Sequence, residues 1–240
     1  MRKILILVAA VVALVVGGGV AHADVYDNYN ELKRAKVLGV DYRITEVRPV
    51  LASTRAAHIA IHGGLIEAGT TQLALEAAHR MNCVAYSFEG IQKKDNHAQL
   101  HITATHFDEP RAEAMVAASN VTVSWHGVSG EERITHVGGA DTDLADRVRT
   151  ALKNAGFTVA RSTPDRIDGD DPRNIANRNA RGKGLQLEIS TAQRNAFFKG
   201  AELDLATIEN PANRTPAFFT YIDAVNSALP IAVGYEDAPR

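Results

Sequence analysis

Short apolar runs alternate with stretches of helical periodicity along most of the chain. The apolar runs predict strands over residues 57–63, 83–90, 120–127, 134–139, 157–161 and 184–190. Amphipathic spacing predicts helices over residues 69–81, 108–119, 141–156 and 215–229. Alternation of this kind with short connections is typical of an α/β fold. We therefore expect a single-domain, three-layer sandwich in which helices cover a mixed, largely parallel sheet.

The first residues follow a different pattern. A short positive start precedes an unbroken apolar run over residues 4–16, and Ala21-His22-Ala23 has the small-x-small form of a cleavage site. The run is shorter than the ~20 residues that a membrane-spanning helix needs. We expect a secretory signal peptide over residues 1–23 and one domain over residues 24–240, in a secreted, periplasmic or otherwise extracytoplasmic protein. An uncleaved amino-terminal membrane anchor is the alternative.

Composition narrows the choice of partners and cofactors. The 240 residues carry a formal net charge of −2, which becomes −4 when Arg2 and Lys3 leave with the signal peptide. This balance gives no indication of nucleic-acid binding, and we expect no stable membrane partner after cleavage. Cys83 is the only cysteine. A disulfide within the chain is therefore excluded, and a metal site must use histidine and carboxylate ligands.

Polar side chains stand where predicted strands end. His62 and His126 each close an apolar run, and each is followed by glycine. Ligands of open α/β sheets bind beyond the carboxyl ends of the strands. Glu67 follows His62 by five residues, and the intervening glycines allow a tight turn that brings both side chains to one ion. Two imidazoles and one carboxylate are a common protein ligand set for catalytic Zn²⁺, with a fourth position left for water.

Glu188 is placed in an otherwise apolar strand. Alternation puts leucine and isoleucine on one face of residues 184–190 and Gln186, Glu188 and Ser190 on the other. A buried charge is costly unless it is paired or bound to metal. Hydrolysis by metal-bound water needs a second carboxylate that takes the proton and passes it to the leaving nitrogen. We predict that Glu188 is this general base. His101 and His106 are alternative metal ligands, or hydrogen-bonding groups at the rim of the site.

Several joined motifs carry a family resemblance over nearly all of the chain after the signal peptide. They are, in order, DVYDNYNELKRAKVLGVDYRI, IAIHGGLIEAGT, SFEG, LHITATHFDEPR, VSWHGVSGEE, VGG and DPRNIANRNARGKGLQLEIS. Together they resemble the poly-γ-glutamate hydrolase family of zinc enzymes. The resemblance implies a carboxypeptidase A-like α/β fold and cleavage of γ-glutamyl amide bonds. By motif it also implies His62, Glu67 and His126 as zinc ligands and Glu188 as the general base.

Arginine and asparagine side chains indicate an acidic substrate. Arg111 begins a predicted helix, and Arg173, Asn174 and Arg178 crowd into the segment before the Glu188 strand. Guanidinium groups match carboxylates in shape and charge, although surface ion pairs in a solvated loop would use the same residues. We predict these four as substrate-binding residues for an anionic γ-glutamyl polymer or peptide. The alternatives are a zinc amidase or carboxypeptidase acting on cell-wall peptides, and a non-catalytic binding protein that retains the fold.

Overall fold

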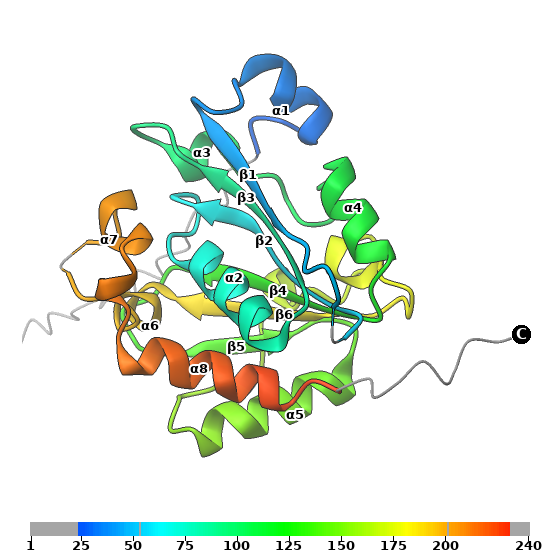
Figure 1. Cartoon of the computed structure of the whole chain (residues 1–240), viewed down its shortest axis with the longest axis vertical. Coiled ribbons are helices and arrows are strands. Elements are labelled where there is room, and N and C mark those ends of the chain that lie inside the picture. Colours follow the sequence, from blue (N-terminus) through cyan, green and yellow to red (C-terminus); the bar gives the residue numbers. More distant parts are fainter. Residues whose placement is uncertain (1–23, 53, 201, 231–240) are drawn as a thin grey trace, which may run out of the picture.

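The computed structural model describes residues 24–52, 54–200 and 202–230 (Figure 1). The predicted signal peptide lies outside the described residues. The strands are β1 (Tyr42–Val47), β2 (Ala56–Gly64), β3 (Val84–Gly90), β4 (Val121–Val128), β5 (Thr135–Gly138) and β6 (Leu185–Ser190). The α-helices are α1 (Tyr29–Ala35), α2 (Thr70–Met81), α3 (Asn96–Leu100), α4 (Pro110–Ala117), α5 (Thr142–Asn154), α6 (Thr191–Asn195), α7 (Leu205–Glu209) and α8 (Pro216–Ser227). Short 3₁₀ turns are η1 (Asp165–Ile167), η2 (Ile175–Asn177) and η3 (Pro211–Asn213).

The six strands form one sheet in the order β1-β3-β2-β4-β6-β5 (Figure 1). The central strands β3, β2, β4 and β6 run parallel to one another, whereas the edge strands β1 and β5 pair antiparallel with β3 and β6. This arrangement confirms the predicted mixed, largely parallel sheet. Its parallel strands all present their carboxyl ends at the same end of the sheet, which is where His62 of β2 and His126 of β4 lie.

Apolar side chains cover both faces of the sheet. On one face, α2, α5 and α8 pack Leu73, Val148 and Tyr221 into a cluster with Trp125 and Leu187 of the strands. On the other face a second cluster is formed by α1, α4, the segment after α3 and strand residues, among them Leu32, Met115, Ile102, Ile59 and Phe88. Two layers of helices around one sheet give the expected three-layer sandwich. In the described part of the chain, no helix combines the length and apolar character needed to cross a membrane.

One predicted strand is wrong. Residues 157–161 do not join the sheet as a strand, and only Val159 forms an isolated bridge, to Thr135. The backbone of Thr135 exchanges hydrogen bonds with Thr158 and Ala160, after which the chain leaves the edge of the sheet. The short edge strand β5 therefore leaves little length against which this segment could pair. The helix α1 and the edge strand β1 are additions that the hydrophobic pattern did not predict.

Candidate metal centre

Two predicted ligands and the predicted general base meet toward the carboxyl ends of the parallel strands. His62 lies near the end of β2, His126 near the end of β4, and Glu188 in β6. The register of the β4–β6 pair sets His126 directly opposite Glu188. Side chains in register on adjacent strands point to the same face, with backbones ~4.8 Å apart. Trp125 and Leu187, which precede His126 and Glu188 in their strands, point toward α2, α5 and α8. Because side chains alternate along a strand, His126 and Glu188 point to the opposite face of the sheet.

The turn between β2 and α2 returns Glu67 to His62. The Glu67 amide donates to the His62 carbonyl over 2.9 Å, which closes the turn. A Cβ at Gly63 would overlap the hydroxyl oxygens of Thr71 and Ser87, and Gly64 has a positive φ of 62°. Only glycine fits both requirements without displacing β3 or α2. The two glycines thus account physically for the five-residue spacing between the histidine and the glutamate.

Three possible ligand atoms converge in the site. His62 Nδ1 lies 3.0 Å from His126 Nδ1 and 3.1 Å from Glu67 Oε1, and the second Glu67 oxygen lies 3.5 Å from His126 Nδ1. A tetrahedral zinc ion with bonds of ~2.0–2.1 Å sets its ligand atoms about 3.3 Å apart. All three side chains are buried. The spacing therefore fits a small divalent cation of the zinc type.

The other atoms of these side chains are held by the protein. His62 Nε2 donates to the Ile102 carbonyl at 2.9 Å, and His126 Nε2 lies 2.9 Å from Ser124 Oγ. Because a carbonyl only accepts, the proton of neutral His62 is on Nε2 and its Nδ1 lone pair faces the site. Glu67 Oε2 accepts the Gly127 amide over 2.8 Å. Outer partners of this kind orient the side chains that bind a metal ion.

The two carboxyl groups of the site have opposite pKa shifts. Burial alone would raise the pKa of Glu67, but the charges and hydrogen bonds that His62 and His126 provide in their protonated forms outweigh burial and hold this pKa well below its usual range. Burial, followed by the negative charge of Glu67, raises the pKa of Glu188 well above its usual range. A pair of carboxyl groups with diverging pKa values is typical of sites in which one is charged and the other exchanges protons.

A chain of amide side chains supports Glu188. Gln186 Nε2 donates to Glu188 Oε1 over 3.0 Å, and Asn174 Nδ2 donates to Gln186 Oε1 over 2.8 Å. The Asn174 side-chain oxygen accepts the Ala176 amide. Asn174 is buried and lies behind Glu188, where it fixes the orientation of Gln186. The contact of Asn174 with a substrate carboxylate stays a prediction. In the structure, Asn174 supports Glu188 through Gln186.

The three predicted arginines lie in local ion pairs. Arg111 pairs with Glu109 at 2.9 Å, Arg173 with Asp171 at 2.6 Å and Arg178 with Glu113 at 2.8 Å. Arg178 also donates to the carbonyls of Thr105 and Arg173, and so ties the segment before η2 to the segment before α4. Among the hydrogen bonds and ion pairs of the described residues, none joins these guanidinium groups to the three candidate ligands. Their role as substrate-binding residues stays a prediction.

Two other arginines, which the sequence did not single out, act on the site. Arg194 is buried, donates to the carbonyls of Ala68 and Ile189, and packs so closely on Gly127 that a Cβ there would lie 2.6 Å from its guanidinium carbon. The positive charges of Arg194 and of exposed Arg166 act on Glu188 and oppose the rise of its pKa. In the sequence, Gly127 was the signal for the packing of Arg194, because a glycine in a strand often marks the close approach of another group.

The alternative histidines have different positions. The ring centroid of His101 lies 4.0 Å from that of His62, and His101 Nδ1 donates to Asp24 Oδ1 over 2.7 Å. Glu67, His97 and His101 offer a second set of possible ligand atoms, all within 4.8 Å of one another. His106 is exposed and belongs to neither ligand set among the described residues. His101 therefore borders the centre, as expected for a residue at its rim.

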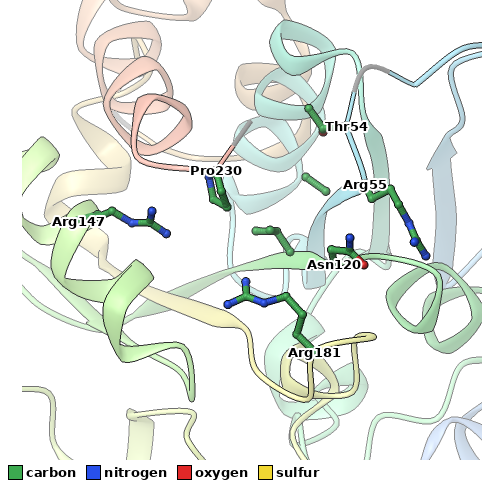
Figure 2. A pocket seen from close by; sticks show the side chains of 8 residues that line it. Thr54, Arg55, Asn120, Arg147, Arg181 and Pro230 are labelled. Carbon is green, nitrogen blue, oxygen red and sulfur yellow. The ribbon is translucent and has the colours of Figure 1, made fainter. Parts of the chain in front are cut away.

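A separate hollow lies at the other end of the strands (Figure 2). Its volume is about 390 Å³, and its lining includes Ala56 and Val121, which begin β2 and β4, together with three arginines. One of them, Arg181, pairs with buried Asp141 at 2.9 Å. Six residues of strand separate Ala56 from His62, a distance of roughly 20 Å. The hollow is therefore distinct from the candidate metal centre.

Comparison with known sequences identifies similar proteins. The family described as poly-gamma-glutamate hydrolase matches residues 26–224. The SPbeta prophage-derived protein YoqZ of Bacillus subtilis (strain 168) is 38% identical over 190 residues, which cover 78% of this chain and 66% of YoqZ. YndL of the same organism is 38% identical over 172 residues, or 70% of this chain and 64% of YndL. The chain thus spans just under two thirds of the length of these two relatives.

Solved structures share the fold at similar identity. A bacteriophage poly-gamma-glutamate hydrolase has a TM-score of 0.79 and 37% identity, over 86% of this chain and 96% of the phage chain. YndL, solved in a zinc-free apo form, has a TM-score of 0.78 and 32% identity, over 86% of this chain and 97% of the YndL chain. These matches confirm the predicted zinc-carboxypeptidase-like α/β fold.

Proposed function

Because this chain belongs to the family described as poly-γ-glutamate hydrolase and is similar to a phage enzyme of that description, we propose that it is a zinc-dependent enzyme that cleaves poly-γ-glutamate. One observation carries the metal dependence: His62 Nδ1, His126 Nδ1 and Glu67 converge within 3.5 Å while their remaining polar atoms are held by Ile102, Ser124 and Gly127. The zinc-free form of YndL indicates that this relative takes zinc, which supports the same ion here.

The residues around the centre suit amide hydrolysis. A bound zinc ion would supply an activated water and polarise the scissile carbonyl. Glu188, held by Gln186 at Oε1, takes a proton at its carboxylate and passes it to the departing amide nitrogen. Its raised pKa makes the carboxylate a stronger base than a solvent-exposed glutamate. The positive charges of Arg194 and Arg166 offset the two neighbouring carboxylates.

The proposed substrate is acidic, and the proposed place of action is outside the cytoplasm. Every γ-linked residue of the polymer carries a free α-carboxylate, which guanidinium groups bind well. Exposed Arg166 is close enough for its charge to act on Glu188, and Arg111, Arg173 and Arg178 remain proposed contacts for carboxylates farther along the polymer. The predicted signal peptide over residues 1–23 supports export to where such a polymer is found.

Product analysis tests this function. Purified protein is incubated with zinc and poly-γ-glutamate and, separately, with muropeptides, and the products are identified by mass spectrometry. We expect γ-glutamyl oligomers from the polymer and no cleavage after treatment with a zinc chelator. Cleavage of muropeptides alone would assign a cell-wall amidase or carboxypeptidase instead. Binding of the polymer without any cleavage would assign a non-catalytic binding protein.

A further inference from the structure

Asp24, the first residue after the predicted signal peptide, lies beside the candidate metal centre. Its Oδ1 accepts a hydrogen bond from His101 Nδ1 over 2.7 Å. Its Oδ2 accepts from the Thr103 amide over 2.6 Å and from the Thr103 hydroxyl over 2.7 Å. The side chain is only 13% exposed. One carboxylate therefore holds both ends of the three-residue segment 101–103.

The middle residue of that segment orients a candidate metal ligand. The Ile102 carbonyl accepts from His62 Nε2 over 2.9 Å. The ring of His101 packs on the ring of His62, with centroids 4.0 Å apart and planes inclined by 32°. Both neighbours of Ile102 are thus fixed by Asp24, and one of them also packs on His62. Partners of this kind fix the tautomer and direction of a ligating histidine.

We propose that Asp24 is a positioning residue for the metal centre: its carboxylate holds segment 101–103 so that the Ile102 carbonyl and the His101 ring keep His62 aimed at the ion. The inference rests on the proposed zinc-dependent function and adds a residue before α1 to the support of the site. If the signal peptide is removed after Ala23, the first residue of the mature protein takes part in metal binding.

The charge on Asp24 suits this role. Burial alone would raise its pKa, but hydrogen bonds from His101 and Thr103 outweigh burial and lower the pKa to about 2. The carboxylate is therefore ionised at neutral pH, and hydrogen bonds to an ionised acceptor are stronger than neutral ones.

Separate contacts anchor the rest of the amino-terminal segment. Asp108 accepts from the Tyr29 amide over 2.6 Å and from the Asn30 side chain over 2.9 Å. Tyr29 also packs edge-on against Tyr42 and Phe88. Removal of the Asp24 carboxylate therefore leaves α1 attached to the sheet, and we expect the variant to fold.

Asp24→Ala in the full chain, with Asp24→Asn as a milder change, tests the proposal. The matched control is Asp204→Ala, because Asp204 also accepts from an amide and a hydroxyl of one threonine, Thr207, but at the exposed start of α7. Intact mass establishes that all proteins begin at the same residue. Zinc affinity is measured by competition with a chromogenic chelator, and protection of the Thr103 amide is measured by hydrogen exchange in metal-free protein.

We expect Asp24→Ala to bind zinc about 10–100-fold more weakly and to lose protection at Thr103, with a smaller effect for Asp24→Asn and none for the control. Unchanged zinc affinity in Asp24→Ala overturns the positioning role. Zinc binding by the wild-type protein without cleavage of any γ-glutamyl bond refutes the hydrolase alone, since the affinity comparison still decides the role of Asp24. A wild-type protein that binds no zinc refutes both.

Discussion

At the scale of single residues, the site depends on two neighbouring carboxyl groups that differ in their surroundings. Glu67 faces two imidazoles and the Gly127 amide, and its pKa is held low. Glu188 is buried and lies near the negative charge of Glu67, and both effects raise its pKa. The first group therefore suits a permanent negative ligand, and the second suits a group that gains and loses a proton.

Replacement of Glu188 by glutamine separates these roles. Glu188→Gln keeps the shape and an oxygen that can accept from Gln186, but it removes the basicity. We expect a folded protein with normal zinc content and a kcat that is lower by ~10²–10⁴-fold. Metal analysis and steady-state kinetics on poly-γ-glutamate are the measurements. Loss of zinc would make Glu188 a ligand, and near-normal turnover would assign the base to another residue.

The ligands are tested one at a time. His62→Ala and His126→Ala each remove one of three converging atoms, so we expect zinc content to fall from about one ion per chain to a small fraction of that. Elemental analysis after dialysis against limiting zinc is the measurement, with His106→Ala as the exposed control. Undiminished zinc in a folded His126→Ala protein would move the site toward the set Glu67, His97 and His101.

Recognition of substrate carboxylates is tested through KM. Arg166 is exposed and acts electrostatically on Glu188, so Arg166→Ala should raise KM for poly-γ-glutamate about 10–100-fold, the range of one lost charged hydrogen bond. Zinc content should not change. The same measurement on Arg111→Ala, Arg173→Ala and Arg178→Ala tests the role predicted for those residues. An unchanged KM would limit them to their ion pairs with Glu109, Asp171 and Glu113.

At the scale of elements, the β2–α2 turn packs so tightly against β3 that a methyl group added at Gly63 should destabilise the fold. The Cβ of Gly63→Ala would overlap Thr71 Oγ1 and Ser87 Oγ, both buried, so β3 or α2 must move. We expect a loss of about 1–3 kcal/mol in the free energy of unfolding, together with weaker zinc binding because Glu67 follows this turn. Urea titrations of metal-free protein measure the first effect.

Gly130→Ala is the matched control for the turn, because its Cβ would meet Ser190 Cβ at 3.4 Å and its φ is not positive. This control should keep wild-type stability and zinc affinity. Wild-type stability in Gly63→Ala would mean that the turn has room for a side chain, and that the spacing of the motif has another cause.

The sequence predicted those elements whose pattern is local. The central strands are long apolar runs, and α2, α5 and α8 each present an apolar stripe to the sheet. The edge strand β1 was missed because Glu46 stands on the face of Tyr42 and Ile44, where the alternation would place an apolar residue. On the other face, Arg43 pairs with buried Glu89 of β3. Residues 157–161 were wrongly predicted as a strand. Their alternation is regular, but among the described residues they pair with the sheet only through the bridge between Val159 and Thr135.

The same distinction applies to the site. The histidine, the two glycines and the glutamate of the β2–α2 turn lie within six residues, and local geometry explains their spacing. The contacts of Asp24 with His101 and Thr103 span 77 and 79 residues, and Arg194 reaches Ala68 across 126. No local pattern encodes pairs at such separations, so the outer support of the metal centre became visible only in the folded structure.

At the scale of the whole molecule, one buried histidine should make stability depend on pH. His58 is fully buried in β2 and accepts the Trp125 indole N–H over 3.1 Å. Burial lowers its pKa from 6.5 to about 3. Its neutral form is therefore the folded form, so its full contribution to stability is present above pH 6.5 and is lost as the pH falls toward 3. The loss is at most about 1.4 kcal/mol per pH unit.

Denaturant titrations of metal-free protein from pH 7 to pH 4 measure this effect. His58→Asn offers an oxygen to the Trp125 indole but does not titrate, so its unfolding free energy should fall less steeply than that of the wild type. Parallel curves for the two proteins would contradict the assignment. Metal must be removed first, because His62 and His126 would otherwise add the pH dependence of zinc binding.

The candidate ligands belong to different elements: His62 to β2, Glu67 to the following turn and His126 to β4. An ion that they share acts as a removable cross-link, and mass action relates its supply to the lifetime of the fold. Each tenfold excess of free zinc over the dissociation constant adds about 1.4 kcal/mol to the stability of the folded form. Where zinc is scarce, the protein would therefore become sensitive to proteases as well as inactive, so that metal starvation shortens its lifetime.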